Sequence, residues 1–485
     1  MTFRPLRTLY LIHRWLGIGI GVLVLLWFAS GVVMLYVPYP QLSNAERRAA
    51  LKPLIAGQVQ VSAARAWQAS GAQGAPESVR LANLTTLTGP RPAYLFFQAG
   101  KWYAVWADSA QLRAPVSAAE AARAAQSMRP GAVRASEKIE RDQWSLGGLD
   151  THRPLYRVEL DDAAGSMLYI SSHTGEVVRD TARAERLWNW AGSVIHWIYF
   201  TPLRSAREPW RLAVMWTSAA AFGMVLSGMV IGILRLRLRR RYAGGRITPY
   251  QGWKRWHHLL GTVVGVAALT WLFSGWLSVN PFALFGAAGI TRTDQLTIAG
   301  GELGGAELTI SAAELLAKQP GAILEVEFLR FAGTGYWRLY RADGAASTLV
   351  RAHDGSAVTL SMARLVAAAS GLRPGVDVAG SAWLNEGDLY YYRHHDDEPL
   401  PVVRVDFSDT AQTSFYLEAA SGHLLGYADS NSRTYRWLFN AMHRLDFPWL
   451  IRHRPVWDAL VIALCLCGAA LSVTGLMLGW RRLRA

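Results

Sequence analysis

The chain has 485 residues, of which 51% are hydrophobic and only 18% charged, and its formal net charge is +15. This length exceeds one ordinary domain, and this composition excludes a disordered or collagen-like chain. Two cysteines, Cys465 and Cys467, are too few for a disulfide scaffold or for a zinc or iron–sulfur site built from cysteines.

Four apolar stretches predict four transmembrane helices, because each exceeds the roughly 20 residues that a helix needs to cross a bilayer core. We expect spans in residues 1–37, 210–234, 256–282 and 456–485, the last including a short tail. The apolar run of the first span is longer than that of a cleavable signal peptide, and no Ala-x-Ala site follows it. We therefore interpret it as an uncleaved signal anchor.

Basic residues gather on one side of these spans. Residues 1–14, the loop 235–255 and the tail after residue 480 carry three, eight and three Lys or Arg, with no acidic residue among them. The positive-inside rule then places both termini and this loop in the cytoplasm of a bacterial inner membrane. Segments 38–209 and 283–455 are expected in the periplasm. Short juxtamembrane basic runs of this kind meet anionic membrane lipid, so we expect no nucleic-acid partner.

The two halves of the chain repeat each other, which predicts a parallel duplication about an axis along the membrane normal. At a spacing of 244 residues the identical pairs are His13/His257, Gly17/Gly261, Gly21/Gly265, Trp27/Trp271, Ser30/Ser274 and Gly31/Gly275. At a spacing of 247 they are Tyr169/Tyr416, Gly175/Gly422, Trp190/Trp437, His196/His443 and Gly228/Gly475.

The two outer segments have the alternating pattern of antiparallel strands, with Ala-rich helices between them. Strand pairs are predicted at 91–97 with 101–106, 155–160 with 167–170, 336–340 with 347–350, and 401–407 with 414–417. Helices are predicted at 118–126, 312–318 and 361–369. The expected fold is thus a mixed membrane protein: four transmembrane α-helices in two parallel repeats, with two α+β periplasmic domains of two small units each.

Four histidines form two pairs related by the repeat. His13 and His257 lie about one turn inside the cytoplasmic ends of the first and third spans, each followed at i+4 steps by glycines that would leave a flat strip for a macrocycle. His196 and His443 lie in Trp-rich, interfacial helical segments before the second and fourth spans. His258 is an alternative to His257.

Two readings of these histidines are open. A histidine near a helix end can simply reach water, and glycines can let helices pack closely. Alternatively, each pair holds the iron of one b-type haem, and two strong axial ligands favour electron transfer over oxygen chemistry. In that case Arg14, Arg207, Arg211 and Arg444 are expected to pair with haem propionates or to anchor the interface. His394 and His395 open an acidic run that is either a metal site or a solvated loop.

The chain resembles the PepSY-associated transmembrane family in three places: His13-Arg-Trp-Leu-Gly17 with its echo at 257–261, Leu400-Pro-Val-Val-Arg-Val-Asp-Phe407 followed by 436–447, and Arg454-Pro-Val-Trp-Asp458. The first half departs from the pattern, since Trp197-Ile-Tyr-Phe200 replaces Arg444-Leu-Asp-Phe447. The resemblance implies four spans, PepSY modules outside the inner membrane, and a ferric-siderophore reductase-like activity. It also implies His13, His257, His196 and His443 as haem ligands.

The function expected from the sequence is that of an inner-membrane di-haem b oxidoreductase that reduces a ferric siderophore in the periplasm. No GxGxxG loop joins a strand to a helix, so the electron donor is a membrane quinol or a separate cytoplasmic reductase. One alternative is a non-enzymatic PepSY sensor or peptidase-regulating protein. The other is a siderophore transporter, which would carry charged residues or prolines at mid-span; no such residue lies in the middle of any of the four spans.

Overall fold

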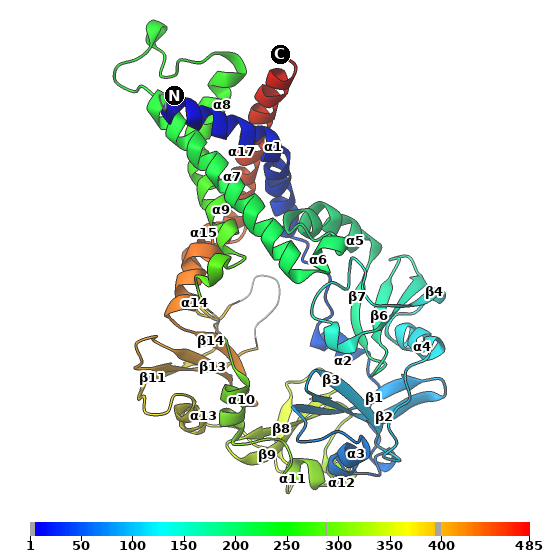
Figure 1. The fold of residues 1–485 in the computed structure, drawn as a ribbon. Helices are drawn as coiled ribbons and strands as arrows, with labels where there is room; N and C mark the ends of the chain where they lie inside the picture. The colour runs from blue at the N-terminus through cyan, green and yellow to red at the C-terminus, as the bar shows by residue number, and fades with distance from the viewer. Residues whose placement is uncertain (1–4, 287–288, 393–398) are drawn as a thin grey trace. The chain divides into compact units, whose positions relative to one another are not determined.

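The protein is described by a computed structural model covering residues 5–286, 289–392 and 399–485. His394 and His395 lie outside the described residues. The chain forms two compact units (Figure 1). The helical unit comprises Met1–Tyr39, Leu187–Ala287 and Asn431–Ala485, and the sheet unit comprises Pro40–Arg186 and Ala288–Ser430.

Three helices of the helical unit are long and apolar enough to cross a membrane, which indicates a membrane protein. They are α1 (Pro5–Met34), α7 (Arg207–Arg235) and α17 (Val456–Leu483). The third predicted span is not one straight helix. It consists of α8 (Gly252–Val263) and α9 (Gly265–Leu277), bent by 62°, so a fourth span exists only if this pair counts as one.

The bend between α8 and α9 occurs at a glycine. A Cβ on Gly265 would lie only 2.3 Å from Sδ of Met229, so the Met229 side chain occupies space that a larger residue at this position would need. A Cβ on Gly21 would likewise lie 3.1 Å from Leu476. These two glycines thus lie against side chains of neighbouring helices, and the flat strip for a macrocycle stays a prediction.

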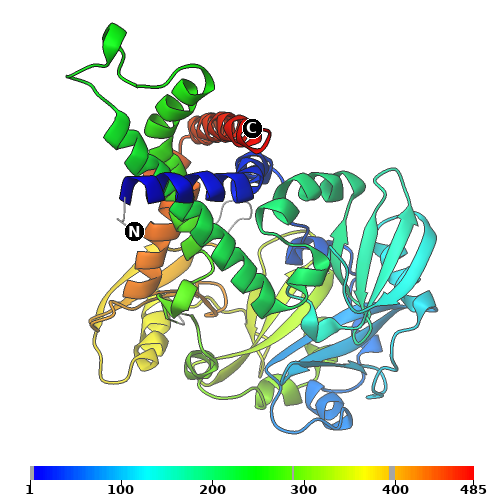
Figure 2. The same ribbon diagram turned by 45° about the horizontal axis from the view of Figure 1, so that its top comes forward.

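The spans form a bundle in which α1 and the α8–α9 pair lie diagonally. Helix α1 packs against α7 and α17, and the α8–α9 pair packs against the same two helices. The start of α1, the end of α17 and the α7–α8 loop lie at one end of this bundle (Figures 1 and 2). Val24, Phe28, Ala221, Met224 and Leu272 are among the buried residues at its centre.

Short helices precede α7 and α17, as the Trp-rich segments predict. Helix α5 (Arg183–Asn189) continues into a π-helical turn, Trp190–Val194, and α6 (Thr201–Arg204) follows. In the second half, α14 (Ser430–Tyr435), a π-helical turn (Arg436–Ala441), α15 (Met442–Arg444) and α16 (Pro448–Ile451) take the corresponding places. Trp188, Trp190 and Trp437 are exposed, as interfacial residues would be.

The sheet unit holds three antiparallel sheets. The six-stranded sheet has the order β10-β9-β8-β1-β2-β3, with β1 (Ser78–Thr86), β2 (Gly89–Gln98), β3 (Lys101–Trp106), β8 (Ile323–Phe331), β9 (Thr334–Arg341) and β10 (Thr348–Arg351). One four-stranded sheet has β4 (Ala132–Ile139), β5 (Leu155–Asp161), β6 (Met167–Ser171) and β7 (Val177–Thr181) in order. The other has β11 (Val378–Leu384), β12 (Val402–Phe407), β13 (Ser414–Glu418) and β14 (Leu424–Ala428). The four predicted strand pairs are confirmed.

Helices cover these sheets. Helices α3 (Ala63–Ala69) and α12 (Ala312–Lys318) pack on the six-stranded sheet, α4 (Ala118–Met128) on β4–β7, and α13 (Met362–Ala369) on β11–β14. The predicted helices at 118–126, 312–318 and 361–369 are therefore confirmed. The other helices of the unit are α2 (Asn44–Ala49), α10 (Arg292–Ala299) and α11 (Ala306–Thr309).

The six-stranded sheet joins the two halves of the chain. Strands β1 and β8 pair antiparallel with Leu81 opposite Val326, and the two hairpin turns, Thr86–Gly89 and Phe331–Thr334, lie 245 residues apart. The separate outer domains expected at 38–209 and 283–455 therefore share one sheet. Both β1 and β8 are buried over most of their length, and the charged side chains of Arg80 and Glu325 lie among their apolar residues.

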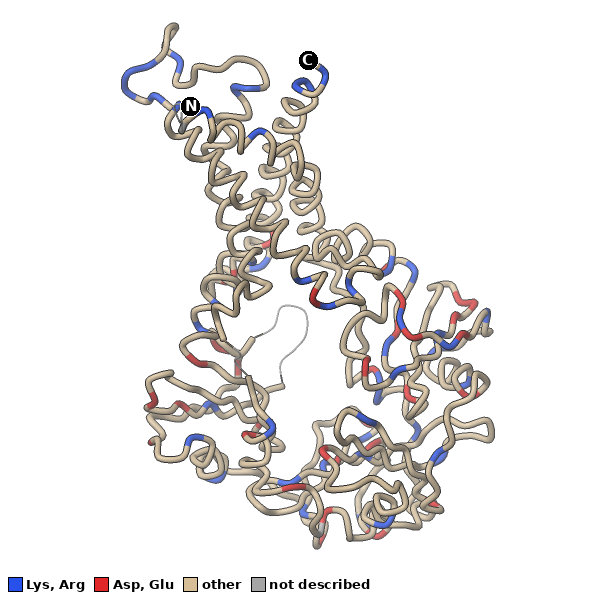
Figure 3. Tube along the Cα trace, in the orientation of Figure 1, with Lys and Arg blue, Asp and Glu red and all other residues tan. Residues whose placement is uncertain are grey.

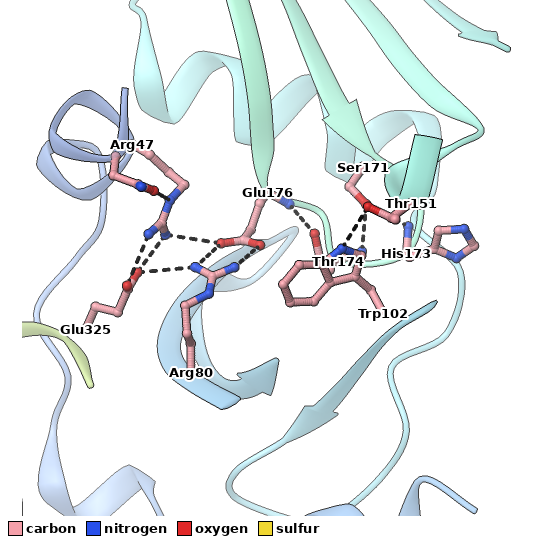
Figure 4. A network of polar contacts seen from close by, with 10 residues as sticks. Arg47, Arg80, Trp102, Thr151, Ser171, His173, Thr174, Glu176 and Glu325 are labelled. Atoms are coloured by element: carbon pink, nitrogen blue, oxygen red, sulfur yellow. Dashed lines mark hydrogen bonds and ion pairs between the residues drawn. The ribbon is translucent and has the colours of Figure 1, made fainter. Parts of the chain in front are cut away.

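A buried network of four charges connects two sheets of this unit (Figure 4). Arg47 of α2 lies 2.6 Å from a carboxylate oxygen of Glu325 and 3.2 Å from one of Glu176. Arg80 of β1 lies 2.9 Å from Glu176 and 3.3 Å from Glu325. Because both carboxylates are almost fully buried, each guanidinium compensates a charge that water cannot solvate.

Candidate functional site

The helical unit brings the four predicted histidines together as two pairs. The ring centres of His13 and His257 lie 6.0 Å apart, with their planes at 39°. Those of His196 and His443 lie 6.1 Å apart, with their planes at 71°. Each pair joins one residue from each half of the chain, as the repeat predicts.

The first pair is held by the two helices that flank it. Nδ1 of His13, on α1, lies 2.8 Å from the carbonyl oxygen of Met224 on α7. Nδ1 of His257, on α8, lies 3.0 Å from Oγ1 of Thr474 on α17. The Thr474 hydroxyl donates its own hydrogen to the carbonyl of Leu471, at 2.7 Å.

The second pair is held by hydroxyls on α1 and α9. Nδ1 of His196 lies 3.0 Å from Oγ of Ser30, and Nδ1 of His443 lies 3.1 Å from Oγ of Ser274. Each serine donates to the carbonyl three residues earlier, Ser30 to that of Trp27 and Ser274 to that of Trp271. The two arrangements are thus the same, one from each half.

These contacts assign the tautomer of all four rings. A hydroxyl has one hydrogen, and Ser30, Ser274 and Thr474 each give theirs to a backbone carbonyl. Each must therefore accept from the imidazole, as the carbonyl of Met224 does from His13, so Nδ1 carries the proton. Within the described chain, Nε2 of these four rings makes no hydrogen bond. Its lone pair is available to a metal, and such second contacts orient metal-ligating histidines.

A glycine lies against each of the four rings. A Cβ on Gly228 would be 2.5 Å from Cε1 of His13, and one on Gly475 would be 3.1 Å from Cε1 of His257. For Gly275 the distance to Cε1 of His443 would be 3.3 Å, and for Gly31 that to Cε1 of His196 would be 3.8 Å. At the first three positions a side chain would come too close to the imidazole, so glycine leaves the space that the ring occupies.

The spacing of the rings fits two axial ligands of one haem iron. Two metal–nitrogen bonds of about 2 Å, plus about 1 Å from each nitrogen to its ring centre, give about 6 Å between ring centres. Within the described chain, no group of three or more His, Cys, Asp or Glu side chains could hold a bare metal ion. Two imidazoles supply two ligands, which suits a metal that brings four ligands of its own, as haem iron does.

An apolar groove of about 480 Å³ runs between α1 and α17 beside the first pair. Gly17, one turn after His13, lines one wall, and Val473, which precedes Thr474, lines the other. The groove has no charged residue among its lining, so it suits an apolar ligand edge or an acyl chain.

The structure gives the adjacent residues His257 and His258 different contacts. His258 is buried, and both of its ring nitrogens are engaged, Nδ1 with Oγ1 of Thr248 at 2.8 Å and Nε2 with the carbonyl oxygen of Gly232 at 2.9 Å. It has no nitrogen left for a metal, whereas His257 faces His13. Of the two alternatives, the geometry therefore favours His257 as the ligand.

The four predicted arginines lie outside the two ring pairs. Arg14 and Arg207 are exposed. Arg211 forms an ion pair with Glu208 at 2.9 Å. Arg444, next to His443, is exposed and lies over the ring of Phe439 at 5.6 Å. Their pairing with propionates stays a prediction.

The residues that hold the imidazoles were not assigned a role from the sequence. They are Ser30, Ser274, Thr474, Gly228, Gly475, Gly31 and Gly275. All but Thr474 belong to identical pairs of the repeat, at the same spacings as the histidines. Identity across the repeat was thus the available signal, because the polar contacts themselves cross between helices more than 160 residues apart in the chain.

Comparison with known proteins found no characterised relative that matches the chain. The sequence model of the PepSY-associated TM region matches residues 10–482, which include all four helical segments of the bundle, both histidine pairs and the whole sheet unit. The chain therefore belongs to the PepSY-associated transmembrane family.

Proposed function

We propose that this protein is a di-haem b oxidoreductase of the bacterial inner membrane that passes electrons across the membrane and reduces the iron of a ferric siderophore in the periplasm. Both termini would be cytoplasmic and the sheet unit periplasmic. The observation that carries the proposal is the doubled pair of imidazoles, each ring with Nδ1 hydrogen-bonded to an oxygen of a neighbouring helix and, within the described chain, no hydrogen bond at Nε2.

The separation of the pairs along the bundle supports a path across the membrane. Ser30, which holds His196, follows His13 by 17 residues on α1, and at 1.5 Å per residue this is about 25 Å. The hydrocarbon core is about 30 Å thick, so the pairs lie near its two surfaces. Haem bound at each pair would supply one redox centre at each side of this layer.

The chain's own residues would hold these centres and exclude exchangeable ligands. His13 with His257 and His196 with His443 would each hold one haem between two imidazoles, and haem held in this way would supply transfer of single electrons. Each ferric ion of the substrate accepts one electron and becomes ferrous. A siderophore binds iron through hard oxygen atoms that prefer the higher charge, so reduction weakens the chelate. The electrons come from a quinol or a separate cytoplasmic reductase.

The first test is the absorption spectrum of the detergent-purified full chain. We expect a Soret band with sharp α bands on reduction, and two haems per chain by pigment extraction. His13→Ala and His196→Ala should each remove about half of this haem, and His258→Ala serves as the matched control that keeps it. The reduced protein should then reduce a ferric trihydroxamate siderophore, with Fe(II) trapped by a ferrous chelator.

The alternatives predict other results. A PepSY sensor or peptidase-regulating protein would be colourless and unaffected by these substitutions. A siderophore transporter would move the intact ferric complex into vesicles without releasing Fe(II). A colourless, fully folded protein would overturn the proposed function.

A further inference from the structure

The end of the bundle that we assign to the cytoplasm carries positive charges and no acidic residue. We define the basic loop as residues 235–255, which hold seven Arg, one Lys and no acidic residue (Figure 3). The helical unit has only three acidic residues. Glu208 and Asp458 lie in the first turns of α7 and α17, at the opposite end of these helices, and Asp446 precedes α17. The field at the basic loop is therefore uncompensated within the unit.

The basic loop is folded. The backbone N–H of Arg237 donates to the carbonyl of Ile247 at 2.9 Å, and Tyr242 pairs with Arg246 as an antiparallel bridge. The guanidinium of Arg237 lies 4.4 Å from the ring centre of Tyr242. Gly244 and its neighbour Gly245 turn the chain at φ of 73° and 70°, values that glycine adopts without strain.

Polar contacts attach this loop to the helices that carry the first histidine pair. The ring of His258 bridges Thr248 of the loop and the carbonyl of Gly232 on α7. Tyr250 of the loop shares a hydrogen bond of 2.9 Å with Tyr10, which lies three residues before His13. Arg235 donates to the same Tyr10 hydroxyl at 2.9 Å. The loop is thereby held at the end of the bundle where His13 and His257 meet.

The held loop presents exposed cations. Arg237, Arg239, Arg240, Arg241, Lys254 and Arg255 are all exposed. Orienting a span and attracting anionic lipid require positive charge alone, without a defined loop conformation. A folded loop presents its charges in one arrangement, which is the property that a complementary protein surface recognises.

We propose that the basic loop is the docking surface for a soluble electron-transfer protein with an acidic face, which delivers electrons at the His13/His257 end. This inference rests on the proposed function and chooses the soluble donor over the quinol. Attraction between the opposite charges would speed association and weaken with added salt.

The test uses the full chain in nanodiscs of zwitterionic lipid, with an acidic flavodoxin as the probe. Association is measured by surface plasmon resonance at low and high salt, and haem reduction by stopped flow. The triple variant Arg239→Gln, Arg240→Gln and Arg241→Gln removes three charges from the loop. The matched control, Arg481→Gln, Arg482→Gln and Arg484→Gln, removes three from the tail. Neither set touches the contacts of Tyr10 or His258.

We expect the loop variant to associate about tenfold more slowly and to lose most of its salt dependence, while the tail variant changes less than about twofold. Reduction by dithionite should stay unchanged in both. Equal losses in the two variants would show a non-specific charge effect and overturn the inference. So would unimpaired flavodoxin binding when the loop variant loses only its affinity for anionic vesicles, which would identify lipid as the occupant.

The inference and the proposed function fail separately. Haem-containing protein that a quinol reduces rapidly, with no flavodoxin binding, would sink the docking surface and leave the oxidoreductase intact. Salt-dependent flavodoxin binding to a colourless protein would sink the oxidoreductase and, with it, the electron delivery assigned to this surface.

Discussion

Oγ1 of Thr474 lies 3.0 Å from Nδ1 of His257, although 217 residues separate the two in the chain. Through this contact a residue of α17 orients an imidazole on the neighbouring α8. Nε2 of that imidazole makes no hydrogen bond within the described chain. Ser30 and Ser274 do the same for the second pair. Four predictions follow from contacts between residues that are distant in the chain.

Thr474→Val should weaken haem binding at the His13/His257 pair by about tenfold, because valine has the same shape but cannot accept from Nδ1. Haem titration into the apoprotein measures this affinity. Thr270→Val is the matched control, since the Thr270 hydroxyl bonds only the carbonyl of Ala267 on its own helix. Equal effects of the two substitutions would show that the hydroxyl has no role in holding the ring.

Gly228→Ala should displace His13 and lower the haem content by about half, since its Cβ would lie 2.5 Å from Cε1 of the ring. Gly223→Ala on the same helix is the control. A Cβ there meets nothing within 4 Å, so the alanine should preserve haem content. Pigment extraction measures the haem content of both variants. Retention of the full haem content in Gly228→Ala would contradict the proposed position of His13.

His258→Ala should lower the free energy of unfolding by about 1–3 kcal/mol, because it leaves the Gly232 carbonyl and the Thr248 hydroxyl without their partner. His257→Ala should instead remove haem with a smaller effect on the unfolding of the apoprotein. Thermal unfolding followed by circular dichroism, together with the Soret absorbance, separates the two roles. The reverse pattern would make His258 the ligand.

Glu176→Gln should destabilise the protein by about 3–5 kcal/mol at neutral pH, since it leaves the largely enclosed Arg47 and Arg80 with one carboxylate. Burial alone would raise the pKa of Glu176, but Arg80 and Arg47 lower this pKa to about 2. The stabilisation is thus complete above the ordinary pKa of 4.5 and is lost as pH falls toward 2.

Urea unfolding at pH 7, and at several values between 4.5 and 2, tests this expectation, with a flatter pH profile expected for Glu176→Gln. Glu137→Gln is the control. Its carboxylate pairs with Arg157 at 2.9 Å, but its side chain is 60% exposed, so the cost should stay below about 1 kcal/mol. An unchanged profile in Glu176→Gln would show that the network contributes no linkage.

The sequence determined the local elements of this protein and which residues to compare. Hydropathy located α1, α7 and α17, because a span must be apolar along its whole length. Alternation of apolar and polar residues located hairpins such as β12–β13, although β13 itself is buried along its whole length. The repeat singled out the two histidine pairs, because residues related by a duplication recur at nearly one spacing.

Tertiary structure alone decided what these elements contact. Leu81 lies opposite Val326 in a sheet that joins both halves, and strands from different halves of the chain find each other only in the folded protein. Met229 of α7 lies against Gly265, at the bend between α8 and α9, only in the folded bundle. The choice of His257 over His258 depends on Thr248 and Gly232. These two residues bond both ring nitrogens of His258, whereas Nε2 of His257 makes no hydrogen bond within the described chain. Hydrogen bonds and packing between distant segments have no fixed spacing, so no pattern along the chain encodes them.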